Sequence, residues 1–146
     1  MVEHHRLYNE LVGIVGKDFV ADDDFALVAY SRDAGPYSAV LPGAIVRPSS
    51  TEEVADIIKL AKRALIPVVV RGGGATVLGI QICEPRISIV MDTTRMNKVI
   101  EINLENNTVT AECGILCSEL TQRVEEATGN TRSIITVWAP YYIDTL

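Results

Sequence analysis

The sequence predicts an α/β (α+β) fold, in which a small parallel β-α-β subdomain is followed by the start of an antiparallel α+β subdomain. Two observations carry this prediction. Three short apolar segments are separated by a helical segment and then by a glycine loop. This order of elements is typical of parallel strands joined by a right-handed β-α-β crossover. These segments are residues 44–46, 68–70 and 87–91. Further along, residues 99–104 and 108–113 flank Glu105-Asn-Asn107, which is typical of a β-hairpin.

Helices are predicted from apolar spacing and capping residues. Residues about 3 to 15 carry apolar side chains at helical spacing and are closed by Gly16. Asp22-Asp-Asp24 offers N-caps for a short second helix, and Ser50-Thr-Glu-Glu53 is a capping box for a third. We expect the third helix to bury one apolar face. Its expected members are Val54, Ile57, Ile58, Ala61 and Leu65.

The C-terminal region begins with a last predicted helix and then becomes aromatic. Leu116, Leu120 and Val124 mark the helix, which Gly129-Asn130 stops. Residues 133–146 hold three of the chain's eight aromatic side chains and end without a polar tail. Apolar area of this kind normally contacts another surface. We therefore expect self-association through this segment, or a chain that is one piece of a larger assembly.

Composition excludes several classes of function. A chain of 146 residues is long enough for one domain with a real core. The 13 Lys and Arg against 19 Asp and Glu give a net charge of -6, so nucleic acid or an anionic membrane would be repelled. No stretch approaches the roughly 20 apolar residues of a membrane helix, and the polar N-terminus does not resemble a signal peptide. We expect a cytoplasmic protein without a nucleic-acid partner or membrane span.

Cysteine and histidine positions predict no metal site. Cys83, Cys113 and Cys117 form no C-x-x-C pair, so buried free thiols are expected rather than disulfides or a zinc site. His4 and His5 are adjacent and point to different helix faces, so they cannot bind one metal ion as an i, i+4 pair. Both histidines are expected at the surface.

The segment Pro67-Val-Val-Val-Arg-Gly-Gly-Gly-Ala-Thr-Val-Leu-Gly79 leads from an apolar strand into three consecutive glycines. Without Cβ atoms, backbone N–H groups can surround an anion, so the loop is a candidate phosphate site. A Rossmann fingerprint fits poorly, because Val77 stands where a third glycine is needed. A P-loop fits poorly too, because Ile80-Gln81 replaces its lysine and hydroxyl residue. A glycine turn without a ligand is the structural alternative.

Four further stretches complete a pattern together with this loop. They are Tyr30-Ser-Arg-Asp33, Ala44-Ile-Val-Arg-Pro-Ser-Ser-Thr-Glu-Glu-Val54, Ile89-Val-Met-Asp-Thr-Thr-Arg-Met-Asn-Lys-Val99 and Val109-Thr-Ala-Glu-Cys-Gly114. In order and spacing, the chain resembles the first part of the FAD-binding domain of the vanillyl-alcohol oxidase or p-cresol methylhydroxylase type. It looks most like FAD-linked oxidases such as glycolate oxidase and D-lactate dehydrogenase. The resemblance implies an FAD-binding type 2-like fold, with residues 1–95 as the first subdomain and 96–146 beginning the second.

The resemblance also implies FAD with its diphosphate in the glycine loop. The residues it places around the cofactor are Pro48, Val70, Arg71, Gly72, Gly73, Gly74, Ala75, Thr76, Val77, Leu78, Gly79 and Gly114. For Pro48 the alternative is that it only ends its strand. Relatives that attach flavin covalently through this loop have a histidine where Ala75 stands, so the FAD is expected to be non-covalent. The hydroxy-acid enzymes often have a second glycine after Gly79, where this chain has Ile80.

The implied activity is flavin-dependent dehydrogenation of a small 2-hydroxy acid such as lactate or glycolate, with a separate electron acceptor. In the family, a cap domain binds the substrate and carries the catalytic groups, and 146 residues are too few to include it. We therefore expect a partial FAD-binding domain without catalytic residues. Asp33, Asp92 and Glu112 are expected to be caps and exposed strand residues. The alternative is a truncated or partner-dependent half-domain that binds flavin weakly or not at all.

Overall fold

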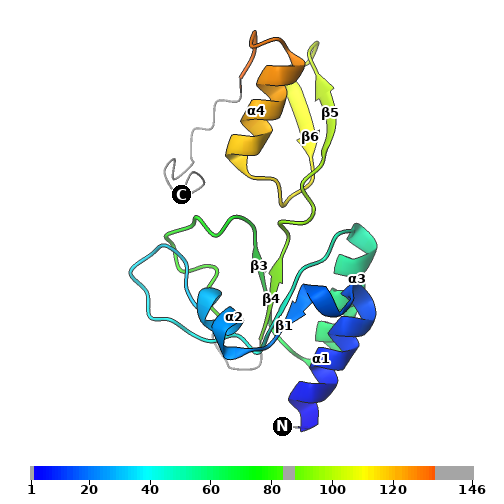
Figure 1. Ribbon diagram of the computed structural model, residues 1–146, viewed down its shortest axis with the longest axis vertical. Coiled ribbons are helices and arrows are strands. Elements are labelled where there is room, and N and C mark those ends of the chain that lie inside the picture. Colours follow the sequence, from blue (N-terminus) through cyan, green and yellow to red (C-terminus); the bar gives the residue numbers. More distant parts are fainter. Residues whose placement is uncertain (1, 84–87, 134–146) are drawn as a thin grey trace.

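A computed structural model describes residues 2–83 and 88–133 of the chain. The mixed α/β architecture predicted from the sequence is confirmed, and Figure 1 shows α4 with the β5–β6 hairpin at one end of the molecule. The helices are α1 (Val2–Val15), α2 (Asp24–Ala29), α3 (Thr51–Ala64) and α4 (Cys117–Ala127). The strands are β1 (Val20–Ala21), β2 (Ala44–Val46), β3 (Val68–Arg71), β4 (Ile89–Asp92), β5 (Val99–Asn103) and β6 (Thr108–Ala111). The predicted aromatic segment and Ile87 lie outside the described residues.

The first sheet has the strand order β1-β2-β4-β3. Strand β4 pairs in parallel with both neighbours, with Ile89 opposite Ala44 of β2 and Val68 of β3. The predicted parallel β-α-β arrangement is confirmed, with β4 inserted between the two strands that α3 connects. Strand β1, which was not predicted, adds an antiparallel edge to β2. Because β2, β4 and β3 are parallel, their carboxyl ends meet at one edge of the sheet.

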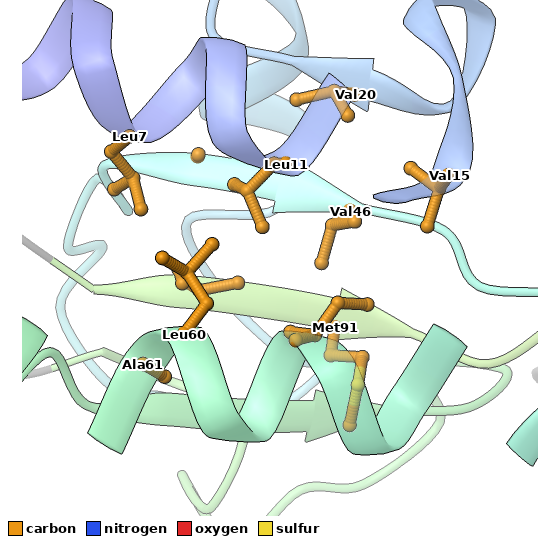
Figure 2. Packing of buried hydrophobic residues seen from close by; sticks show 11 residues of the cluster. Leu7, Leu11, Val15, Val20, Val46, Leu60, Ala61 and Met91 are labelled. Carbon is orange, nitrogen blue, oxygen red and sulfur yellow. The ribbon is translucent and has the colours of Figure 1, made fainter. Parts of the chain in front are cut away.

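Alternate residues of the strands face two separate cores. On one face, Figure 2 shows Leu7 and Leu11 of α1 approaching Leu60 of α3 beside Val46 and Met91 of the sheet. Completing this cluster are Val15, Val20, Ala44, Ile57, Ala61 and Ile89. On the opposite face, α2 packs through Leu27 against Ile45, Val90 and Cys83. Burial of apolar surface on both faces of the parallel strands holds their edge in a fixed geometry.

The buried face of α3 differs from the predicted one. Ile57 and Ala61 are buried as expected, but Leu60 is only 4% exposed, whereas Ile58 is 42% and Leu65 90% exposed. Residues 57, 60 and 61 share one helix face, while position 58 is rotated away from it. Leu65 follows the helix in a left-handed conformation (φ 54°), which takes its side chain off that face.

The second part of the chain is an antiparallel hairpin packed against a helix. Strands β5 and β6 pair as predicted, with Asn107 in the left-handed region (φ 54°) of the turn. Helix α4 buries Val124, and Asn130 also has a positive φ (60°) just beyond it, as its stop signal predicted. The expectation of buried cysteines was wrong for Cys113 and Cys117, which are exposed beside and at the start of α4; Cys83 is buried.

Gly114 joins this second part to the chain that follows β4. Its N–H donates to the Met96 carbonyl over 2.9 Å, and the Glu112 N–H donates to the Lys98 carbonyl over 2.8 Å. A Cβ added at Gly114 would overlap the Thr93 carbonyl oxygen. Only glycine therefore permits the chain after β6 to approach the end of β4 this closely. Within the described ranges, no helix is long and apolar enough to span a bilayer.

Replacement of Leu60 by alanine tests the corrected face of α3. Loss of this buried side chain should lower the free energy of unfolding by about 2–4 kcal/mol, because a cavity forms in the core. The matched change Ile58→Ala removes a half-exposed side chain and should cost less than about 1 kcal/mol. Urea unfolding followed by circular dichroism measures both. Equal losses would contradict the assignment.

Replacement of Gly114 by alanine tests the close approach between the two parts. The added methyl group must displace the backbone at Thr93, so we expect a loss of about 3 kcal/mol or more in the free energy of unfolding. Gly13→Ala is the control, because a Cβ there meets nothing within 4 Å and the position lies inside α1. That change should stabilise the chain by about 0.5–1 kcal/mol. A neutral Gly114→Ala variant would argue against the packing role.

Candidate functional site

The glycine loop leaves the sheet at the carboxyl end of β3. Arg71 is the last residue of this strand and pairs with Asp92 of β4. The Arg71 carbonyl accepts the Thr93 N–H over 2.8 Å and the Thr93 hydroxyl over 3.2 Å. Strand pairing therefore continues to Arg71 and ends there. The following residues form a loop at the shared edge where the parallel strands end.

Backbone amides at the start of this loop have no acceptor among the described residues. Nothing within residues 2–83 and 88–133 accepts the N–H groups of Gly72, Gly73, Gly74 or Ala75. A Cβ at Gly72 would meet nothing within 4 Å, so open space adjoins the loop at this residue, whereas Gly74 is buried. Gly74 has a backbone φ of +81°, which residues other than glycine rarely adopt. Successive free amides beside open space can bind an anionic group.

Arg71 holds a positive charge over the same residues. Its guanidinium Nη2 lies 2.5 Å from the position a Cβ would take on Gly74, so the side chain folds across the loop. Nη1 donates to the Arg32 carbonyl over 3.0 Å, and the guanidinium lies 5.0 Å from the centre of the Tyr30 ring. These contacts fix the cation beside the free amides. Together they favour a ligand that carries negative charge.

The end of the loop is bound to another part of the protein. Asp33 Oδ2 accepts the Gly79 N–H over 2.7 Å, and the Thr76 carbonyl accepts the Ala34 N–H over 3.0 Å. The Thr76 hydroxyl oxygen accepts the Leu78 N–H over 3.3 Å. Asp33, expected to be a cap or an exposed strand residue, accepts backbone N–H groups as a cap does and is 7% exposed. Of the predicted diphosphate amides, the Gly79 N–H is already used within the protein.

The other predicted cofactor residues differ in exposure. The side chains of Val70, Val77 and Leu78 are exposed around the loop. Pro48 is fully buried beyond β2, just before the capping interaction in which Glu53 Oε2 accepts the Ser49 N–H over 2.7 Å. Gly114 is buried against the end of β4. Both positions therefore serve the packing around the sheet edge, and their contact with a cofactor stays a prediction.

A buried polar network at the end of β4 was missed by the sequence analysis. Asp92, expected to be exposed, is 4% exposed and accepts hydrogen bonds from the Thr94 N–H (2.8 Å), the Thr94 hydroxyl (2.6 Å) and the Tyr30 hydroxyl. The Arg47 Nε lies 3.8 Å from Asp92 Oδ2. The order of the strands could have indicated this network, because Arg47 follows β2 and Asp92 ends β4, and parallel strands end at the same sheet edge. Glu112 is partly buried and accepts the Lys98 N–H over 2.8 Å.

Burial raises the pKa of the Tyr30 hydroxyl from 10.0 to about 12, and its hydrogen bond to Asp92 adds to this shift. The phenol is thus kept protonated as a donor to the carboxylate. In the part of the chain that the structure describes, no group of three or more His, Cys, Asp or Glu residues could hold a metal ion. The chemistry that the described site offers is the binding of an anion.

The titration of Tyr30 should make stability depend on pH in the alkaline range. Because its folded-state pKa of about 12 exceeds the ordinary value of 10.0, its stabilising contribution is complete below pH 10 and is lost as the pH rises through 12. The free energy of unfolding should fall less between these pH values in Tyr30→Phe than in the wild type. Urea unfolding measures this, and the tyrosinate absorbance difference between the two proteins gives the pKa. A difference centred near pH 10 would contradict the network.

Comparisons with known proteins identify the family of the chain. A family model described as FAD binding domain matches residues 42–134. The glycolate oxidase subunit GlcD of Bacillus subtilis (strain 168) is 28% identical over 116 residues, which cover 80% of this chain and 24% of that protein. The D-2-hydroxyglutarate dehydrogenase of Stutzerimonas stutzeri (strain A1501) is 32% identical over 123 residues, which cover 82% of this chain and 26% of that protein. The chain thus spans about a quarter of the length of these curated relatives.

A solved structure of p-cresol methylhydroxylase with substrate bound has a TM-score of 0.84 at 23% identity and covers 98% of this chain and 28% of that one. At this identity the likeness concerns the fold. The family resemblance drawn from the sequence is confirmed, because the matching family model covers more than half of the chain. The chain belongs to the FAD binding domain family, and FAD is the cofactor that this family membership assigns to it.

Proposed function

We propose that this chain supplies the diphosphate-binding part of a flavin-dependent oxidoreductase that dehydrogenates a small 2-hydroxy acid such as lactate or glycolate. The observation that carries the proposal is the run of backbone amides from Gly72 to Ala75, which have no acceptor among the described residues, with the Arg71 guanidinium against Gly74. FAD carries two negative phosphate charges, and this run can neutralise them without a lysine. The donor set of the loop therefore fits the cofactor.

Within this proposal the predicted residues divide by role. Arg71, Gly72, Gly73, Gly74 and Ala75 contact the diphosphate. The Thr76 hydroxyl, whose oxygen accepts the Leu78 N–H, keeps its hydrogen for a phosphate oxygen. Gly79, Pro48 and Gly114 support the surrounding backbone, while the exposed Val70, Val77 and Leu78 offer apolar surface to the rest of the cofactor.

The cofactor is proposed to be dissociable. Ala75 stands directly after the glycines and has no atom able to form a bond to flavin. The loop then contributes only hydrogen bonds and charge. Such binding depends on how well the free amides are arranged before FAD arrives.

The redox chemistry comes from FAD, which when bound accepts a hydride equivalent from the substrate carbon and passes electrons to a separate acceptor. The described part of the chain binds and orients the diphosphate. The 2-hydroxy-acid class is supported by the names of the glycolate oxidase subunit and the D-2-hydroxyglutarate dehydrogenase. Substrate contacts and catalytic groups are proposed to lie on a cap domain outside this quarter-length match. A cytoplasmic location and the absence of a nucleic-acid partner are part of the proposal.

The hairpin region favours the alternative of a half-domain that depends on a partner surface. Within the described residues the β5–β6 sheet has two strands with α4 packed against it, and a two-stranded hairpin depends on such packing for its stability. Ile100 and Leu104 of this region are exposed. A cavity of about 280 Å³ also opens between the hairpin and Val124 of α4. In this alternative, tight FAD binding requires a further segment or second chain over the hairpin.

Titration of flavin fluorescence with the 146-residue chain tests the proposed site. Gly72→Asp should raise the Kd for FAD at least about tenfold, because a carboxylate beside two phosphate charges opposes binding by about 1–4 kcal/mol. Gly13→Asp is the matched control: it adds the same charge in open space on α1 and should leave the Kd unchanged. No binding by the wild type, or equal losses in both variants, would contradict the proposed site. Binding that appears only with a partner would favour the alternative.

A further inference from the structure

The Tyr30-Ser-Arg-Asp33 segment contacts Arg71 through Tyr30 and Arg32, and its last residue, Asp33, contacts the far end of the glycine loop. We propose that Asp33 is the positioning residue of the glycine loop: its carboxylate holds residues 76–79 in place, and thereby keeps the Gly72–Ala75 amides arranged for a diphosphate. The inference rests on the proposed function and deepens it. It concerns a residue that itself touches no ligand.

Both oxygens of Asp33 are used to join two loops. Oδ1 accepts the Gly35 N–H over 2.8 Å, within its own turn. Oδ2 accepts the Gly79 N–H over 2.7 Å, at the far end of the glycine loop. Asp33 is 7% exposed, so water competes little for these bonds. Hydrogen bonds to a charged acceptor are stronger than those between neutral groups.

Close backbone contacts accompany these hydrogen bonds. The Ala34 N–H donates to the Thr76 carbonyl over 3.0 Å. A Cβ on Gly35 would lie 2.5 Å from the Val77 carbonyl oxygen, and a Cβ on Gly79 would lie 3.0 Å from the Tyr37 ring. The turn after Asp33 therefore lies directly against residues 76–79. The absence of side chains at the two glycines permits this approach.

The same segment also contacts the start of the glycine loop. The Tyr30 ring lies beneath the Arg71 guanidinium at 5.0 Å, and the Arg32 carbonyl accepts its Nη1 over 3.0 Å. The Tyr30 hydroxyl donates to Asp92 and so connects the segment to β4. Residues 30–33 thus contact Arg71 at one end of the loop and Gly79 at the other. The free amides lie between these two attachments.

This arrangement explains why a carboxylate is tolerated near a site for an anion. By charge alone, Asp33 would repel a diphosphate, and neutralising it would strengthen binding. By position, it reduces the conformational freedom that the loop would otherwise lose when FAD binds, so neutralising it would weaken binding. The two effects have opposite signs. The sign of the change therefore separates a positioning role from a purely electrostatic one.

The experiment uses the 146-residue chain with Asp33→Asn, which replaces one acceptor oxygen with an NH2 group that faces a backbone N–H. Asp33→Glu keeps the charge but displaces it by one methylene group. Asp23→Asn is the matched control, because it makes the same charge change and alters another carboxylate that accepts a backbone N–H, that of Ala26 at 3.0 Å. FAD affinity is measured by flavin fluorescence. Hydrogen exchange of the Gly79 amide is measured by NMR without FAD, and circular dichroism checks the fold.

Asp33→Asn should weaken FAD binding about tenfold or more and accelerate exchange of the Gly79 amide. Asp33→Glu should weaken binding in the same direction, and Asp23→Asn should change neither quantity. Unchanged or tighter FAD binding by Asp33→Asn, or unchanged Gly79 exchange, would overturn the inference. A wild-type chain that does not bind FAD would overturn the proposed function and the diphosphate part of the inference. Hydrogen exchange of the Gly79 amide would then still decide whether Asp33 holds the loop. If Asp33→Asn does not fold, the FAD affinity and the Gly79 exchange of Asp33→Glu decide whether the inference holds.

Discussion

The structure depends on the parallel pairing of β4 with both β2 and β3. This pairing places the residues after three strands at one edge of the sheet, and both cores secure it, with Ile89 and Met91 facing one and Val90 the other. Arg71, Asp92 and Arg47 meet at this edge although they are far apart in the sequence. The site is thus a consequence of strand order: if β4 were at the edge of the sheet, Asp92 would have one parallel neighbour instead of two.

The buried carboxylates have a common physical explanation. A buried charge is costly unless hydrogen bonds and opposite charge compensate it. Asp92 has the Thr94 and Tyr30 donors with Arg47 close by, and Asp33 has two backbone amides. In both cases a compensating group comes from a separate segment, so Asp92 connects β4 to the Tyr30 segment and Asp33 connects two loops. The described polar groups around the glycine loop stabilise its framework, and none of them accepts a hydrogen bond from its first amides.

Periodicity and capping predicted most elements, because these depend on neighbours in the sequence. The hairpin was found from Asn107, and the start of α3 from Ser50, whose hydroxyl accepts the Glu53 N–H. The errors concern contacts between distant segments. The Tyr30–Asp92 hydrogen bond spans 62 positions and the Gly79–Asp33 bond spans 46, so no local pattern revealed that either carboxylate is buried. Leu60 was missed because the predicted buried face of α3 included Ile58 and Leu65 in its place.

The glycines of the site illustrate why a motif alone is ambiguous. Gly35 and Gly79 are glycine because another part of the protein lies against them, the Val77 carbonyl in one case and the Tyr37 ring in the other. Gly74 has the Arg71 guanidinium against it, while Gly72 faces open space. A glycine turn without a ligand would explain the first two and the left-handed conformation of Gly74. Such a turn does not explain why the Gly72 backbone adjoins open space while the Arg71 guanidinium lies against Gly74. Exposed backbone amides beside a positive charge are the features that an anion site requires.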